Sequence, residues 1–199
     1  MTINDFVFKV KLKIKNTIVY LFFQYPRVLF YSFLSSIKVA GIKLQPLLSN
    51  GIGKIKIGEN VTFGVKESPY YYSGYSYIDA RKKDSYIEIG DNCFVNNNAT
   101  IISDGKKIII GKNCLIGTNF EITDSNFHDL SAENRFGGKN IIKKDVTIEE
   151  NVFIGNNVTI LKGVIIGKNS VIGNSSVVTK DIPQNSIAVG NPAKVIKQV

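Results

Sequence analysis

The sequence predicts an all-β solenoid that follows a short helical segment. From residue 148 onward, successive six-residue repeats begin with isoleucine or valine, at Ile148, Ile154, Ile160, Ile166, Ile172 and Val178. Earlier copies, in which glycine follows the isoleucine, begin at Ile57, Ile89, Ile110 and Ile116. One β-branched residue in every six would fill a narrow interior, while glycine and asparagine suit turns with unusual dihedral angles. A short strand and a turn make one face, and three faces make a coil of about eighteen residues.

Composition limits the possible chemistry. The chain has 199 residues, a net charge of +9, two cysteines and one histidine, His128. This length suits one domain, and two cysteines are too few for a disulfide framework. A three-histidine zinc site is impossible within one chain, so we expect no metal. Because no zinc-finger, helix-turn-helix or RNA-binding motif accompanies the basic residues, we do not expect a nucleic-acid partner.

The first part of the chain differs from the rest. Residues 1–60 hold nine of the Lys and Arg residues against two acidic ones, and residues 18–34 are rich in aliphatic and aromatic side chains. Pro26 interrupts that apolar run, so we expect two short helices and no membrane span. These helices either cap the solenoid or lie on a membrane surface, a contact that the neighbouring lysines favour. We divide the chain into this basic, apolar segment (1–50), the solenoid (51–187) and a tail (188–199).

Two segments interrupt the six-residue register. Residues 64–88 contain a tyrosine cluster between Tyr70 and Tyr77, which could be a packed loop or an aromatic surface for a sugar. Residues 123–147 form a polar insertion that holds His128. Within the repeats, Cys93 and Cys114 occupy equivalent positions, which predicts small buried side chains in adjacent coils.

At this point the chain resembles the hexapeptide-repeat acyltransferases, whose fold is a left-handed parallel β-helix. The resemblance covers residues 53–196, and the ending Gly190-Asn191-Pro192-Ala193-Lys194 is part of it. The stretch around His128 is similar to that of the capsule and lipopolysaccharide O-acetyltransferases, and other parts resemble the galactoside and maltose acetyltransferases. The resemblance implies a homotrimer with acyl-CoA bound in clefts between subunits.

The same resemblance implies site residues. His128 would be the general base, and Asp124 and Asp129 would each either orient its ring or be a solvated loop carboxylate. The backbone N–H at the turn Gly155-Asn156 would stabilise the oxyanion. Asn97 would either contact the substrate or belong to an asparagine ladder in the turns. The residues expected to bind acetyl-CoA are Phe153, Gly155, Asn156, Gly173, Asn174, Thr179, Lys180, Lys194 and Lys197.

The implied function is acetyl-CoA-dependent O-acetylation of a hydroxyl on a bacterial surface-polysaccharide sugar. Two alternatives stay open: N-acetylation of an amino sugar or nucleotide-linked amino sugar, and a non-catalytic β-helix scaffold. We expect a cytoplasmic protein, with residues 1–45 able to contact the inner face of the plasma membrane.

Overall fold

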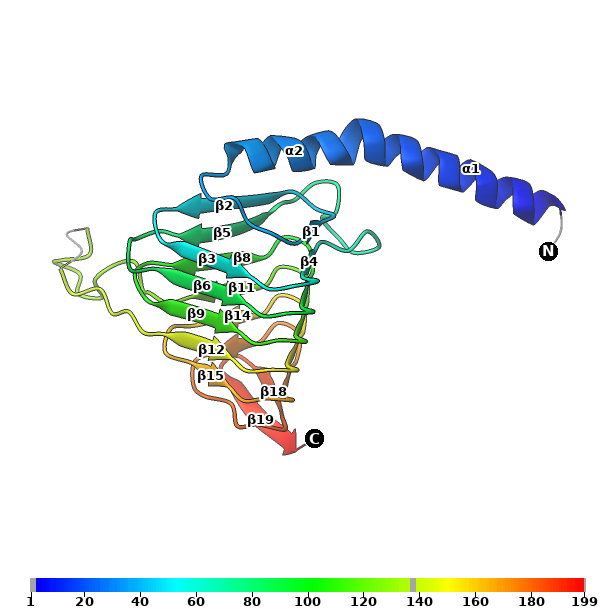
Figure 1. Cartoon of the computed structure of the whole chain (residues 1–199). Coiled ribbons are helices and arrows are strands. Elements are labelled where there is room, and N and C mark those ends of the chain that lie inside the picture. The colour runs from blue at the N-terminus through cyan, green and yellow to red at the C-terminus, as the bar shows by residue number, and fades with distance from the viewer. Residues whose placement is uncertain (1–2, 137–138, 199) are drawn as a thin grey trace.

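The computed structural model describes residues 3–136 and 139–198 and shows a three-sided stack of short parallel strands (Figure 1). Sheet A contains β1 (Ile42–Lys43), β4 (Thr62–Phe63), β7 (Phe94–Val95), β10 (Leu115–Ile116), β13 (Phe153–Ile154), β16 (Val171–Ile172), β18 (Ser186–Gly190) and β19 (Ala193–Gln198). Sheet B contains β2 (Leu47–Gly51), β5 (Ser76–Ala80), β8 (Thr100–Ser103), β11 (Glu121–Thr123), β14 (Thr159–Ile160) and β17 (Val177–Val178). Sheet C contains β3 (Lys54–Ile57), β6 (Tyr86–Ile89), β9 (Lys107–Ile110), β12 (Val146–Ile148) and β15 (Ile165–Ile166). From β1 to β17, successive strands of the chain occupy the three sides in turn.

The core is a set of vertical columns of β-branched side chains. In sheet B, one column runs through Ile78, Ile101, Ile122, Ile160 and Val178, which are paired in register and buried. Each column buries aliphatic surface between neighbouring coils, and the strands bond to the coils above and below them. The predicted inward position of the repeat's first residue is therefore confirmed.

The turns use asparagine and glycine for different reasons. Asparagines in the left-handed region, such as Asn119 and Asn157, stack and bond side chain to side chain. The glycines of the Ile-Gly pairs have negative φ, contrary to the prediction of unusual dihedral angles there. They are needed because neighbouring coils approach closely: a Cβ at Gly155 would overlap the side-chain oxygen of Asn174.

The N-terminal segment is one helical rod and not two separate short helices. α1 (Ile3–Val19) continues through a π-helical turn, η1 (Tyr20–Gln24), into α2 (Tyr25–Leu34). Pro26 lies in the first turn of α2, and the preceding π turn closes with the Tyr25 N–H bonded to the Tyr20 carbonyl. This wider turn accommodates the missing proline N–H, so the chain stays helical. Within residues 3–136 and 139–198, no helix combines the length and apolarity needed to cross a membrane.

The rod lies across the first coil, and α1 extends beyond it (Figure 1). The Gln24 side chain is fully buried and donates hydrogen bonds to the carbonyls of Leu44 and Tyr71. Arg27 donates to the Gly74 carbonyl, and the ring of Tyr31 in α2 packs 4.8 Å from that of Tyr75. The tyrosine cluster is therefore a packed loop that fastens the rod.

Candidate active site

The polar insertion leaves the stack between β11 and β12, on the edge that joins sheet B to sheet C, and Figure 1 shows it projecting from the body. Its base is tied by Asp124, whose buried carboxylate accepts hydrogen bonds from the Ser103 hydroxyl and from the N–H groups of Asp104 and Lys106. Lys143, at the other end of the insertion, pairs with Asp104 at 2.6 Å. We call this set of contacts, made by Asp124, Ser103, Asp104, Lys106 and Lys143, the platform of the loop.

His128 is exposed on this loop, and its ring is oriented by a backbone group. Its Nδ1 lies 3.3 Å from the carbonyl oxygen of Arg135. A carbonyl can only accept a hydrogen bond, so this contact favours the proton on Nδ1 and leaves the lone pair on Nε2. That tautomer suits a general base.

Neither alternative for Asp124 and Asp129 describes their place in the structure: both are buried, and the contact recorded for the His128 ring is with the Arg135 carbonyl. Asp124 is used in the platform, and the Asp129 carboxylate accepts from the N–H groups of Ser131 and Asn140. Both carboxylates shape the loop, and the Arg135 carbonyl takes the orienting position.

Sequence reasoning missed one group beside His128. The Arg81 guanidinium lies 5.1 Å from the centre of the Phe127 ring and donates from Nε to Asp79 at 2.9 Å. Phe127 has a left-handed backbone, with φ of 59°, directly before His128. Stacking of Arg81 on this ring stabilises the strained turn. In the sequence, Arg81 belongs to the basic run at residues 81–83. The six-residue repeat does not show that this run lies next to the insertion.

A second set of predicted residues forms a column at the edge between sheets A and B. The Asn97 side-chain oxygen accepts from the Val65 N–H at 3.0 Å, and that of Asn156 accepts from the Thr118 N–H at 2.9 Å. The Asn174 oxygen accepts from the Asn156 N–H at 2.8 Å. Each asparagine therefore bonds to the backbone of the coil before it.

Asn97 and the Gly155-Asn156 turn are fully engaged in this conformation. The buried Asn97 amide donates to the carbonyls of Val65, Ser68 and Pro69, so it holds the 65–69 loop. The Gly155 N–H bonds to the Ile172 carbonyl as part of the sheet ladder. The Asn156 N–H is bonded only to a side chain, which can rotate away, so it is the donor that could meet an oxyanion.

A shallow hollow of about 300 Å³ lies beside this column, on the outer face of sheet A. Phe94, Leu115 and Phe153 pair in register there, each about half exposed, and Asn156 also lines the hollow. The structure thus brings Phe153 and Asn156 together, next to an apolar surface that suits a flexible chain such as pantetheine.

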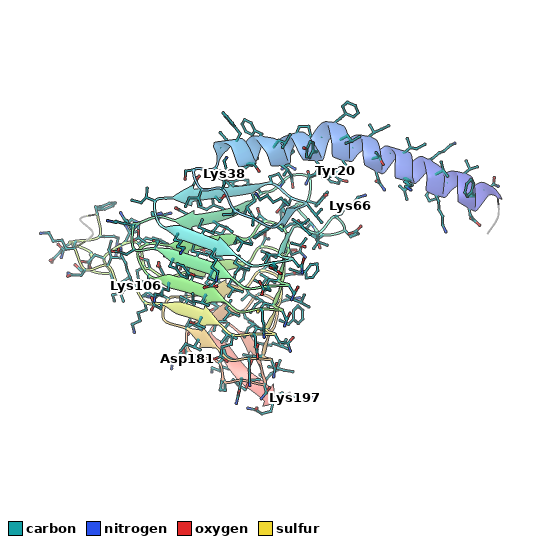
Figure 2. The ribbon with its side chains drawn as sticks, in the orientation of Figure 1. Tyr20, Lys38, Lys66, Lys106, Asp181 and Lys197 are labelled. Atoms are coloured by element: carbon teal, nitrogen blue, oxygen red, sulfur yellow. The ribbon has the colours of Figure 1, made fainter. Side chains whose placement is uncertain are left out.

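The remaining predicted residues lie at the later coils. Gly173 and Asn174 continue the asparagine edge, whereas Thr179 and Lys180 follow β17 at the edge below the insertion. Lys194 and Lys197 belong to β19, which pairs antiparallel with β18, and Figure 2 shows Lys197 at the far end of the stack from the rod. All four of Thr179, Lys180, Lys194 and Lys197 are exposed.

The candidate residues of one chain therefore fall on two different edges. His128, Thr179 and Lys180 lie along the edge between sheets B and C, and Asn97 and Asn156 lie along the edge between sheets A and B. Within the described residues, the two groups share no hydrogen bond or ion pair.

Comparison with known proteins agrees with this fold. Residues 145–180 match bacterial transferase hexapeptide (six repeats), and residues 107–122 match the hexapeptide repeat of succinyl-transferase. The galactoside O-acetyltransferase of Escherichia coli is 40% identical over 143 residues, which cover 72% of this chain and 63% of that enzyme. A maltose O-acetyltransferase structure from Clostridium difficile is 32% identical, with a TM-score of 0.54, covering 85% of this chain and 73% of that one.

A hexapeptide-repeat acetyltransferase from Vibrio cholerae, solved in complex with acetyl coenzyme A, is 26% identical with a TM-score of 0.54 over 87% of this chain and 76% of that one. The chain thus belongs to the hexapeptide-repeat acetyltransferases, and its solenoid is a left-handed parallel β-helix. It spans less than two thirds of the curated relatives that it matches, 63% in the case of the Escherichia coli enzyme.

Proposed function

We propose that the protein is an acetyl-CoA-dependent O-acetyltransferase that acts on a sugar hydroxyl with His128 as general base. The observation that carries this proposal is the Nδ1 contact of His128 with the Arg135 carbonyl, which leaves Nε2 free to take a proton on an exposed loop. Membership of an acetyltransferase family supports the choice of acyl group.

The reaction would proceed in one ternary complex. His128 Nε2 takes the acceptor hydroxyl proton while the oxygen attacks the thioester carbonyl carbon. The negative charge that develops on the carbonyl oxygen is stabilised by the Asn156 N–H, once the Asn174 side chain has turned away. Collapse of the tetrahedral intermediate breaks the C–S bond, and the imidazolium returns the proton to the leaving thiolate.

The active unit in this proposal is a homotrimer, with His128 from one subunit facing the Asn97 and Asn156 edge of the next. The separation of these groups onto two edges of one chain supports it, because neither edge alone holds both a base and an oxyanion donor. Phe153 would pack against the pantetheine, while Thr179, Lys180, Lys194 and Lys197 would surround the phosphates and adenine as exposed polar and positive groups.

For the acceptor we propose a sugar of a bacterial surface polysaccharide, modified in the cytoplasm, with residues 1–45 at the membrane surface. An amino sugar acetylated on nitrogen is the second candidate. The same base and oxyanion donor would serve both reactions, and only the acceptor atom separates them.

The test begins with calorimetric titration of acetyl-CoA, because donor binding does not depend on knowing the acceptor. We expect one site per chain, weakened at least fivefold by Lys180→Ala. Acetyl transfer to galactosides, maltose and surface polysaccharides is then compared for wild type, His128→Ala and the loop control Leu130→Ala. Loss of at least a hundredfold in His128→Ala alone supports the proposal. No donor binding at millimolar acetyl-CoA, or equal activity of all three proteins, would overturn it.

A further inference from the structure

The helical rod exposes an unusual amount of apolar surface. Among its large apolar side chains, Phe22 is 79% and Phe33 is 81% exposed, and Phe8, Ile18, Leu29 and Phe30 are each at least half exposed. Soluble proteins rarely leave so many large apolar side chains of one segment uncovered. In Figure 2 many side chains of the rod project away from the sheets.

The orientation of this surface is fixed by the contacts on the opposite side of the rod. Gln24 and Val28 are buried against the first coil, and Arg27 donates to the Gly74 carbonyl at 2.9 Å. Turning the apolar side inward would break these polar contacts and leave the buried Gln24 amide unsatisfied. The described residues of this chain therefore leave the outer surface uncovered.

The charges of the rod identify the chemistry of that partner. Residues 3–38 contain six Lys and Arg residues and one acid, Asp5. Lys11 and Lys15 line an apolar groove of about 320 Å³ with Ile14 and Ile18. Lysine stems can lie along such a surface while their ammonium groups reach anionic head groups.

The inner side of the rod is also basic. A pocket of about 490 Å³ between α1 and the loop below it is lined by Lys13, Lys66, Tyr20 and Tyr71 among others. Figure 2 shows Tyr20 and Lys66 in this region. Positive charge on this side adds to the general attraction of the rod to an anionic surface. A second copy of the rod would instead bring like charges together, so self-association fits less well.

We propose that the outer surface of the α1–η1–α2 rod docks in the plane of an anionic lipid membrane. Its phenylalanines enter the boundary of the acyl chains, and its lysines contact the lipid phosphates. Because the rod lies across the first coil, the β-helix stands away from the lipid, with its C-terminal hairpin farthest from the surface (Figure 1). This inference goes beyond a general contact of residues 1–45 and does not depend on the acetyl-transfer chemistry.

The test is sedimentation of the full chain with vesicles of phosphatidylglycerol or of phosphatidylcholine. We expect wild type to bind phosphatidylglycerol vesicles far more tightly, and the double variant Phe22→Glu/Phe33→Glu to lose at least 90% of that binding. The matched control is Ile196→Glu, which alters an exposed apolar residue on β19 and should bind as wild type. Circular dichroism checks that each variant is folded.

A second pair of variants tests the charge. Lys11→Gln/Lys15→Gln should weaken binding about tenfold or more, whereas Lys83→Gln/Lys107→Gln on exposed parts of the β-helix should not. Wild type that stays in the supernatant with phosphatidylglycerol vesicles would overturn the proposal, as would unchanged binding of the double phenylalanine variant. If light scattering shows that the phenylalanine variant changes only the oligomeric state, the surface belongs to a second copy and the proposal is wrong.

Discussion

The side-chain oxygen of Asn174 lies 2.8 Å from the backbone nitrogen of Asn156 and accepts its hydrogen bond. This single contact connects a residue of the later coil to the backbone group proposed to stabilise the oxyanion. The Asn156 N–H is therefore already hydrogen-bonded. An oxyanion could accept from it only after the Asn174 side chain has moved away.

Replacing Asn156 separates the role of its N–H from that of its side chain. Asn156 precedes Asn157, which has a φ of 57°, in a two-residue turn whose first position tolerates proline. Asn156→Pro removes the N–H and should lower kcat about a hundredfold or more. Asn156→Ala keeps the N–H and loses only the bond to Thr118, so its kcat should stay within about threefold of wild type. Equal kcat values for the two variants would remove this N–H from the mechanism.

Asn174→Ala should raise kcat and lower stability. In wild type, the Asn156 N–H must give up its bond to the Asn174 oxygen before it can bond to the oxyanion. The variant has no such bond to break, so the barrier to the reaction should be lower. We expect a severalfold higher kcat at saturating acetyl-CoA and a loss of about 1 kcal/mol in the free energy of unfolding. Steady-state kinetics and urea denaturation measure the two quantities. A lower kcat at saturating donor would indicate that Asn174 assists the reaction directly.

Mixed oligomers test whether each site is shared between subunits. His128→Ala and Asn156→Pro subunits, each inactive alone, are combined in equal amounts by co-expression. In a cyclic trimer, one site in each mixed oligomer would join an intact His128 to an intact Asn156 edge, so activity should return to about a quarter of the wild-type value. If the mixture stays inactive although mass spectrometry shows mixed trimers, both groups act within one chain.

Asp124→Ala should destabilise the base of the histidine loop. The substitution leaves the Ser103 hydroxyl and the N–H groups of Asp104 and Lys106 without their buried acceptor. We expect a loss of about 3 kcal/mol in the free energy of unfolding. The exposed Asp84→Ala serves as control and should change stability by less than about 0.5 kcal/mol. A similar small effect for both variants in urea denaturation would show that Asp124 does not hold the platform.

The six-residue period was sufficient to predict the solenoid because it records directly which side chain enters the core. The period also predicted that Cys93 and Cys114 are buried in adjacent coils, and both side chains are fully buried. The period could not reveal that Pro26 is accommodated by a π turn, since that depends on hydrogen bonds which the sequence does not display. The period also could not show that the glycines of the Ile-Gly pairs are required by the close packing of neighbouring coils.

The candidate site was harder to predict than the fold. The type of residue at His128 pointed to a base, but the group that orients its ring is a backbone carbonyl, and every residue supplies one. The position of Arg81 next to Phe127 depends on stacking residues that are 46 positions apart in the chain. Such a contact depends both on how the coils stack and on the path of an irregular loop, and the repeat pattern does not describe that path.

The two ends of the stack have a consequence for how the protein behaves at high concentration. A column of parallel strands has open edges at both ends, and such edges can template further chains into fibrils. Here the helical rod lies across the first coil, and at the other end β19 runs in the opposite direction and pairs antiparallel with β18. Both ends of the stack therefore depart from the regular parallel coil, which disfavours its growth into a filament.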